Sequence, residues 1–92
     1  MGLEFDPAKN AKNAKERGLP FEMAAELEWQ KAIVSIDSRF EYGEERLVAI
    51  APMRGRLYVV CYLFRGRVRR IISLRKANKR EERAYAKAAT DE

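Results

Sequence analysis

Two short Arg-Gly links constrain the fold of this 92-residue chain more than any other feature. Arg54-Gly55 and Arg65-Gly66 separate runs that are rich in β-branched, aromatic and aliphatic residues. Two-residue links that end in Gly are typical of tight β-hairpins between such runs. We therefore expect an antiparallel meander of three strands, over residues 46–51, 57–64 and 67–74.

Helical patterns lie on both sides of the meander. Asp6 and Pro7 suit a helix start, because Asp caps free amide groups and Pro fits the first turn. Ala residues then recur on one side of the pattern, and Gly18 is placed to end it. This pattern predicts a helix near residues 7–16.

A second short amphipathic pattern covers residues 20–28, and a fourth strand is expected over 29–36, before a polar loop at 37–44. After the meander, Asn78 and Glu81 make a weak capping box. They predict a C-terminal helix that docks on the sheet through an apolar stripe of Ala84, Tyr85 and Ala88.

The whole chain, residues 1–92, is expected to form one α+β domain, since it is too short for a second core. This domain has two N-terminal helices, a four-stranded antiparallel sheet and a C-terminal helix. Cys61 is the only cysteine and lies in an apolar run, which predicts a buried thiol and a reducing compartment. No signal peptide or membrane-length apolar run is seen, so we expect a cytoplasmic protein without membrane contact.

The positive charge is concentrated in the second half of the chain. Residues 1–52 carry seven Lys or Arg against ten Asp or Glu, a net charge of −3. Residues 53–92 carry twelve against four, a net charge of +8. Such asymmetry favours a polyanionic partner, although a basic solvated surface is an equally ordinary explanation.

The last hairpin brings aromatic rings and arginines together. If Arg65-Gly66 is the turn, Phe64 lies opposite Arg67 and Tyr62 opposite Arg69 on one face. Rings and guanidinium groups in this pattern suit single-stranded RNA, although tyrosines are also common strand residues. The opposite face is more apolar and should meet the helices, which leaves Arg70 among apolar neighbours and in need of a partner.

Five cations lie close to the start of the last predicted helix. Basic side chains match a helix N-terminus poorly unless an anion intervenes, so a phosphate site is one interpretation. The alternative is that Glu81 and Glu82 neutralise part of the cluster and that water solvates the rest. The five cations are Arg75, Lys76, Lys79, Arg80 and Arg83.

Several classes of site are excluded by composition. The chain has no histidine, so a histidine-dependent triad or a usual zinc site is not expected. It also lacks a Gly-rich phosphate loop and a paired-cysteine motif. Glu44 and Glu45 are adjacent, so at most one of them can face a site on a strand.

Short segments spread over residues 4–85 together form a recognisable pattern, by their order and spacing. They are Glu4-Phe5-Asp6-Pro7-Ala8-Lys9, Gly18-Leu19, Phe21-Glu22, Ala24-Ala25, Gly43-Glu44-Glu45-Arg46, Arg54-Gly55-Arg56-Leu57, residues 70–77 and Arg80-Glu81. In this pattern the chain resembles the BrnT toxin family. One position departs from it, since Arg17 stands where family members usually carry a histidine.

The resemblance implies a RelE-like fold and ribonuclease activity that needs no metal or other cofactor. It also implies a BrnA-type antitoxin as partner, in a heterotetramer that binds operator DNA only through the antitoxin. A toxin of this kind inhibits translation by cutting RNA.

For that activity we expect an RNA 2′-hydroxyl to attack the neighbouring phosphate. Arg70 and Arg75 are assigned to charge stabilisation, because arginine is a poor base. Glu45 is the predicted base, assisted by a lysine or Tyr85. The predicted RNA-binding residues are Arg46, Tyr62, Arg67, Arg69, Lys76, Lys79, Arg80 and Arg83.

Two other functions fit the same residues. One is a non-catalytic basic module that binds nucleic acid, and the other is a partner-binding module whose basic surface an acidic protein covers. Cleavage products separate these alternatives from the ribonuclease.

Overall fold

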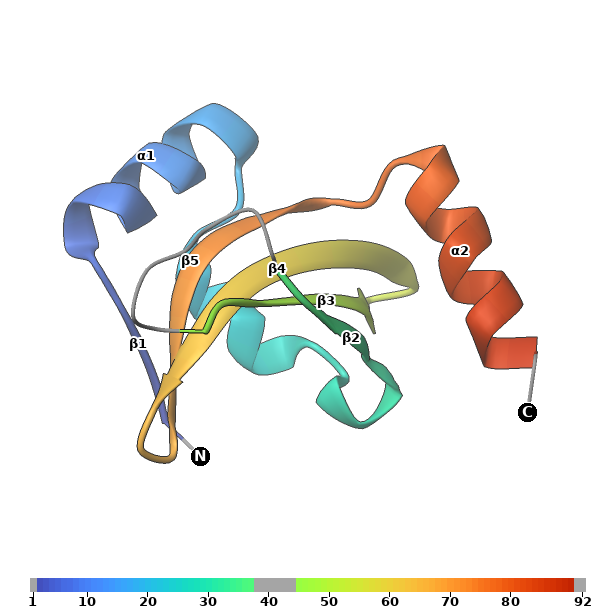
Figure 1. Cartoon of the computed structure of the whole chain (residues 1–92). Coiled ribbons are helices and arrows are strands. Elements are labelled where there is room, and N and C mark those ends of the chain that lie inside the picture. The colour runs from blue at the N-terminus through green and yellow to red at the C-terminus, as the bar shows by residue number, and fades with distance from the viewer. Residues whose placement is uncertain (1, 38–44, 91–92) are drawn as a thin grey trace.

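The computed structural model describes residues 2–37 and 45–90, and it confirms an α+β architecture (Figure 1). A five-stranded mixed sheet has the order β1-β5-β4-β3-β2. The central strand β4 and its neighbour β5 form the long curved hairpin of Figure 1. The strands are β1 Leu3–Phe5, β2 Ile33–Ile36, β3 Leu47–Met53, β4 Arg56–Arg65 and β5 Val68–Lys76.

The strand β1 adds a parallel pair to an otherwise antiparallel sheet. Leu3 pairs with Arg69, Glu4 with Arg70 and Phe5 with Ile71. The prediction of a four-stranded antiparallel sheet was therefore wrong by this one strand. Three residues are too few to show a period of two, so the sequence carries little signal for it.

The first helix, α1 (Pro7–Arg17), has the predicted ends. Oδ1 of Asp6 accepts hydrogen bonds from the amides of Ala8, at 2.8 Å, and Lys9, at 3.5 Å. Gly18 closes the helix with a φ of 69°, a conformation that favours Gly. The local start and stop signals are therefore confirmed.

The predicted second helix is instead a pair of 3₁₀ turns, η1 (Phe21–Glu26) and η2 (Trp29–Lys31). Phe21, Ala24 and Leu27 are all buried. A 3₁₀ turn has three residues per turn, so positions i, i+3 and i+6 line one face. Because these turns continue to Lys31, β2 begins at Ile33 and the predicted strand start at residue 29 was wrong.

The first predicted hairpin turn is confirmed and the second is displaced by one residue. Arg54 and Gly55 have φ values of 53° and 76°, as a type I′ turn requires. In the second hairpin Arg65 pairs with Val68, so Gly66 and Arg67 form the turn. As a result Phe64 lies opposite Arg69, and the predicted pairing of Phe64 with Arg67 was wrong.

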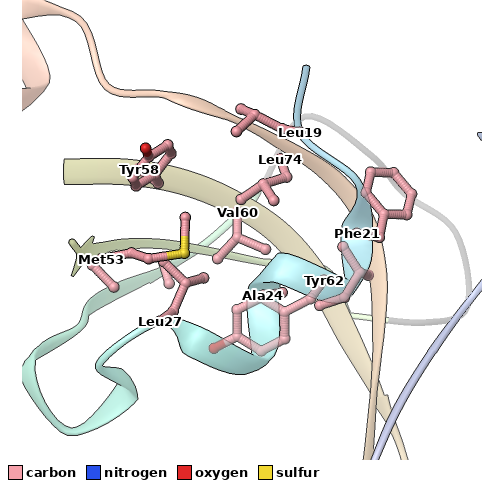
Figure 2. Close-up of a cluster of buried hydrophobic side chains, with 12 residues drawn as sticks. Leu19, Phe21, Ala24, Leu27, Met53, Tyr58, Val60, Tyr62 and Leu74 are labelled. Atoms are coloured by element: carbon pink, nitrogen blue, oxygen red, sulfur yellow. The ribbon is translucent and has the colours of Figure 1, made fainter. Parts of the chain in front are cut away.

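The core lies on the face of the sheet that carries Tyr58, Val60 and Tyr62 (Figure 2). The segment from Leu19 to Leu27 packs against them. We expected the opposite face of β4 to meet the helices, and that expectation was wrong. Val59, Cys61 and Leu63 on that opposite face are also at most 9% exposed, so alternation along β4 could not identify the core face.

The C-terminal helix α2 (Lys79–Thr90) begins with the predicted capping box. The Glu81 amide donates to Oδ1 of Asn78 at 2.8 Å, and the Asn78 amide donates to Oε1 of Glu81 at 2.9 Å. The predicted docking of its apolar stripe on the sheet was wrong, because α2 buries none of its residues. Instead, the Tyr85 hydroxyl donates to the Lys31 carbonyl oxygen at 2.7 Å.

Candidate nucleic-acid interface

A β-bulge in β5 decides which way its arginines point. Tyr62 pairs with Ile71 and Cys61 pairs with Ser73, so Ile72 is an extra residue. In a regular strand Arg70 and Arg75 would point to opposite faces, since they are five residues apart. The bulge instead places both on the side of the sheet opposite the core, which we call the arginine face, with Arg70 opposite Leu63 and Arg75 opposite Val59.

Arg75 is held by a carboxylate from the first turn of α2. Its Nη1 lies 2.8 Å from Oε1 of Glu81, and its Nη2 lies 2.6 Å from Oε2. Two parallel bonds of this kind fix the plane of the guanidinium group. The hydrogen bond from Arg75 lowers the pKa of Glu81, against a smaller opposing effect of burial. The Glu81 carboxylate therefore stays ionised and is a weak base.

Arg70 finds its partner on the strand that the sequence did not predict. Its Nη1 lies 3.4 Å from Oε1 of Glu4, across the parallel β1–β5 pair. This contact satisfies the expectation that an arginine among apolar neighbours must reach a partner. The Arg70 side chain is still 30% exposed and that of Glu4 39%, so a phosphate can reach the pair.

The side chain of Arg69 points to the core side of the sheet, at the end next to the β4–β5 turn. Its guanidinium carbon lies 3.9 Å from the centroid of the Trp29 ring and 5.3 Å from that of Phe64. Tyr62 is 2% exposed, and burial raises the pKa of its hydroxyl while the charge of Arg69 and a hydrogen bond to it act in the opposite direction. The sequence suggested Tyr62 and Arg69, but it gave no reason to include Trp29.

Comparison with known families matches residues 5–81 to the ribonuclease toxin BrnT of type II toxin–antitoxin systems. The chain belongs to the BrnT family. The match covers Phe5 of β1, the other four strands with Arg70 and Arg75, and ends at Glu81. It confirms the family inferred from the sequence, and it makes RNA the substrate class and an antitoxin the partner. No curated protein matches the chain.

The other two residues predicted for the BrnT active site, Glu45 and Tyr85, lie near different parts of the sheet. Glu45 is exposed and lies two residues before β3, whose first residue pairs with Tyr62. That end of the sheet also holds Arg70, opposite Leu63. Tyr85 lies on α2, one helical turn after Glu81, at the end that holds Arg75. The four predicted catalytic residues thus come from β5, α2 and the residues before β3, and the structure does not bring them to one point.

The predicted RNA-binding cations of this BrnT chain are spread over three places. Arg46 is half-buried directly before β3, and Arg67 is exposed in the turn between β4 and β5. Lys76 is exposed at the end of β5, opposite Tyr58. The first turns of α2 expose Lys79, Arg80 and Arg83.

Two polar side chains of α1, Asn13 and Arg17, hydrogen-bond to β5 beside the bulge, and the sequence did not reveal these contacts. Nδ2 of Asn13 donates to the carbonyl oxygens of Leu19, at 2.7 Å, and Leu74, at 2.9 Å. Arg17 donates to Oδ1 of Asn13 at 3.1 Å and to the same Leu74 oxygen at 3.3 Å. The residue at the position where BrnT proteins usually carry a histidine therefore fixes the backbone directly before Arg75.

The described residues contain neither a cluster of metal-ligating side chains nor a membrane-spanning helix. Within residues 2–37 and 45–90, no group of three or more Asp, Glu, Cys or His side chains is placed to hold a metal ion. None of the helices in these ranges is long and apolar enough to cross a membrane.

Proposed function

We propose that this chain is an endoribonuclease that cuts RNA on the arginine face by attack of a 2′-hydroxyl on the neighbouring phosphate, and that this cleavage stops translation. The observation that carries the proposal is the bulge at Ile72. It turns Arg70 and Arg75 to one side of the sheet and leaves both partly exposed. A guanidinium group suits a phosphate on which negative charge increases during attack, and the second one can bind another phosphate of the same strand.

Both arginines are available to RNA although both are paired. The side chains of Arg75 and Glu81 are 40% and 22% exposed, and partly exposed ion pairs contribute little to stability. A phosphate can therefore replace or share a carboxylate at modest cost. At about 3.3 Å per residue, the two Cα atoms are separated by roughly 13 to 16 Å, so the side chains bracket a short length of backbone.

Proton transfer is assigned to Glu45, with Tyr85 as the second candidate. An exposed carboxylate is a competent acceptor for the 2′-hydroxyl proton. The Tyr85 hydroxyl already donates to a backbone carbonyl, so its proton is not free for the leaving oxygen. Glu45 lies before β3 and the Tyr85 hydroxyl lies at Lys31, so the group that acts shows where the reacting phosphate binds.

The remaining cations are proposed to carry the RNA backbone on either side of the cut. Lys79, Arg80 and Arg83 extend the basic surface from Arg75 along α2, and Arg46 extends it from Arg70, while Lys76 adds a cation on the other side of the sheet, opposite Tyr58. Exposed cations in a row attract phosphates through release of counterions, without base specificity. Tyr62 is buried and acts through its contact with Arg69.

The partner is proposed to be a BrnA-type antitoxin, in a cytoplasmic heterotetramer that binds operator DNA only through the antitoxin. Membership of the BrnT family supports this assembly. The excess of positive charge in residues 53–92 favours an acidic partner segment on the same surface. Co-expression, purification and light scattering test the composition, and a toxin that binds operator DNA alone would contradict it.

The mechanism is tested with two RNA oligonucleotides of one sequence, one natural and one 2′-O-methylated throughout, each with and without EDTA. We expect cutting of the natural RNA alone, unaffected by EDTA, with 2′,3′-cyclic phosphate ends. Cleavage of the methylated RNA, or loss of activity in EDTA, would overturn the mechanism. Tight binding of natural RNA without products would favour the non-catalytic alternative.

A further inference from the structure

Phe64 is the exposed end of an aromatic stack that contains an arginine. Its ring is 44% exposed although it lies on the core side of the sheet. The guanidinium carbon of Arg69 lies 5.3 Å from the centroid of the Phe64 ring and 3.9 Å from that of the Trp29 ring. Tyr62 supports Phe64 edge-on, with centroids 5.7 Å apart and ring planes at 87°. The Phe64 ring therefore packs against Arg69 and Tyr62 while part of it stays exposed.

The charge of Arg69 is not neutralised by a carboxylate in the part of the chain that the structure describes. Its Nε atom is buried without a hydrogen-bond partner, while its guanidinium group contacts three aromatic rings and hydrogen-bonds to the uncharged Tyr62 hydroxyl. Aromatic faces attract a cation but leave its positive charge in place. An anion next to this end of the sheet therefore meets a fixed positive charge.

A second cation lies close by. Arg67 is exposed in the β4–β5 turn, two residues from Arg69, while Phe64 and Arg69 are directly opposite each other in the hairpin. The other exposed large apolar residues of the described chain are Ile33, Val34 and Ile36, which are aliphatic. Phe64 thus combines an exposed planar ring with nearby guanidinium groups.

We propose that Phe64 stacks an unpaired RNA base while Arg67 and Arg69 hold the adjoining phosphate, in a subsite at the end of the β4–β5 hairpin and outside the arginine face. Base stacking on an aromatic ring and phosphate binding by arginine are the two contacts that single-stranded RNA makes most readily. The inference rests on the proposed function, because it takes RNA as the substrate. It adds a site that fixes one nucleotide and leaves the cutting chemistry elsewhere.

The test compares a 2′-O-methylated RNA oligonucleotide with the same backbone carrying abasic positions. Fluorescence anisotropy measures the affinity of wild type, Phe64→Leu and Phe64→Tyr for both. Loss of one stacked base weakens binding by roughly tenfold. We expect wild type and Phe64→Tyr to bind the oligonucleotide with bases roughly tenfold more tightly than the abasic one. Phe64→Leu should bind the two with nearly equal affinity. Ile36→Ala, at a 61% exposed position on β2, is the matched control and keeps the preference.

Trp29 gives a second readout, because it is the only tryptophan and packs on Arg69. We expect the oligonucleotide with bases to change Trp29 fluorescence in wild type and to change it much less in Phe64→Leu. The same base preference in Phe64→Leu and wild type would overturn the subsite, while cleavage at the arginine face would stand. If wild type bound neither oligonucleotide, the subsite and the proposed function would both be overturned.

Discussion

Arg75 and Glu81 are joined by two parallel hydrogen bonds of 2.8 and 2.6 Å, which tie the end of β5 to the first turn of α2. The same carboxylate accepts the Asn78 amide and so caps the helix. One side chain therefore orients the arginine and starts the helix that follows it. The arrangement couples the stability of α2 to the position of the proposed catalytic group.

This coupling predicts a pH dependence of stability. The hydrogen bond from Arg75 lowers the pKa of Glu81 in the folded state below its ordinary value of 4.5. The pair therefore contributes fully above pH 4.5, and its contribution is lost as the pH falls through the lower folded-state value. Wild type should exceed Glu81→Gln in free energy of unfolding at pH 7, with a smaller difference at pH 3. Urea unfolding at both pH values measures this, and an unchanged difference would contradict it.

Loss of the Asn13 side chain should destabilise the fold. Asn13 is 8% exposed, and its amide group serves two backbone carbonyls. Asn13→Ala leaves these oxygens without that donor, at a cost of about 2 to 3 kcal/mol in free energy of unfolding. Chemical denaturation measures the change, and Lys12→Ala, on the exposed side of the same helix, is the control. Equal stability of the two variants would show that the hydrogen bonds of Asn13 do not stabilise the fold.

The first hairpin turn should be intolerant of a side chain at Gly55. Its φ is 76°, and a Cβ atom there would meet no other atom within 4 Å. The cost of Gly55→Ala is therefore one of backbone conformation alone, about 1 to 2 kcal/mol. Thermal unfolding measures this cost. Gly2→Ala, at a position where φ is not in the left-handed region, is the control and should be nearly neutral. A harmless Gly55→Ala would argue against the type I′ turn.

The general base of the cleavage reaction can be identified by two conservative substitutions. If Glu45 accepts the 2′-hydroxyl proton, Glu45→Gln lowers the single-turnover cleavage rate by about 10² to 10⁴. Tyr85→Phe should change that rate by only a few fold, because the Tyr85 hydroxyl already donates to the Lys31 carbonyl. The reverse result would place the reacting phosphate at the Arg75 end and assign the proton transfer to Tyr85.

Local signals in the sequence predicted the helix ends and one hairpin well. Asp6, Gly18 and the Arg54-Gly55 turn act through their own backbone conformation, so each can be recognised in isolation. The second hairpin could not be resolved, because both Arg65-Gly66 and Gly66-Arg67 place a Gly in a two-residue turn. That ambiguity moved the predicted register and with it the predicted neighbours of Phe64.

The residues of the proposed site could be listed from the sequence, but their geometry could not be predicted. Arg70 and Arg75 were assigned together, although a regular strand separates them by face. The bulge that brings them to one side lies next to the carbonyl of Leu74, which Asn13 and Arg17 hold from a distant helix. Long-range contacts of this kind leave no periodic pattern, and neither does the three-residue strand that supplies Glu4 to Arg70.

The most direct test is single-turnover RNA cleavage by Arg75→Ala, beside Arg56→Ala. Arg56 is an exposed arginine at the same end of the sheet as Arg75, but on the core side. Circular dichroism confirms that both variants are folded. We predict that Arg75→Ala loses at least about a hundredfold in rate and no longer arrests growth, while Arg56→Ala acts as wild type. A folded Arg75→Ala variant that cuts RNA at the wild-type rate would contradict the assignment of catalysis to the arginine face.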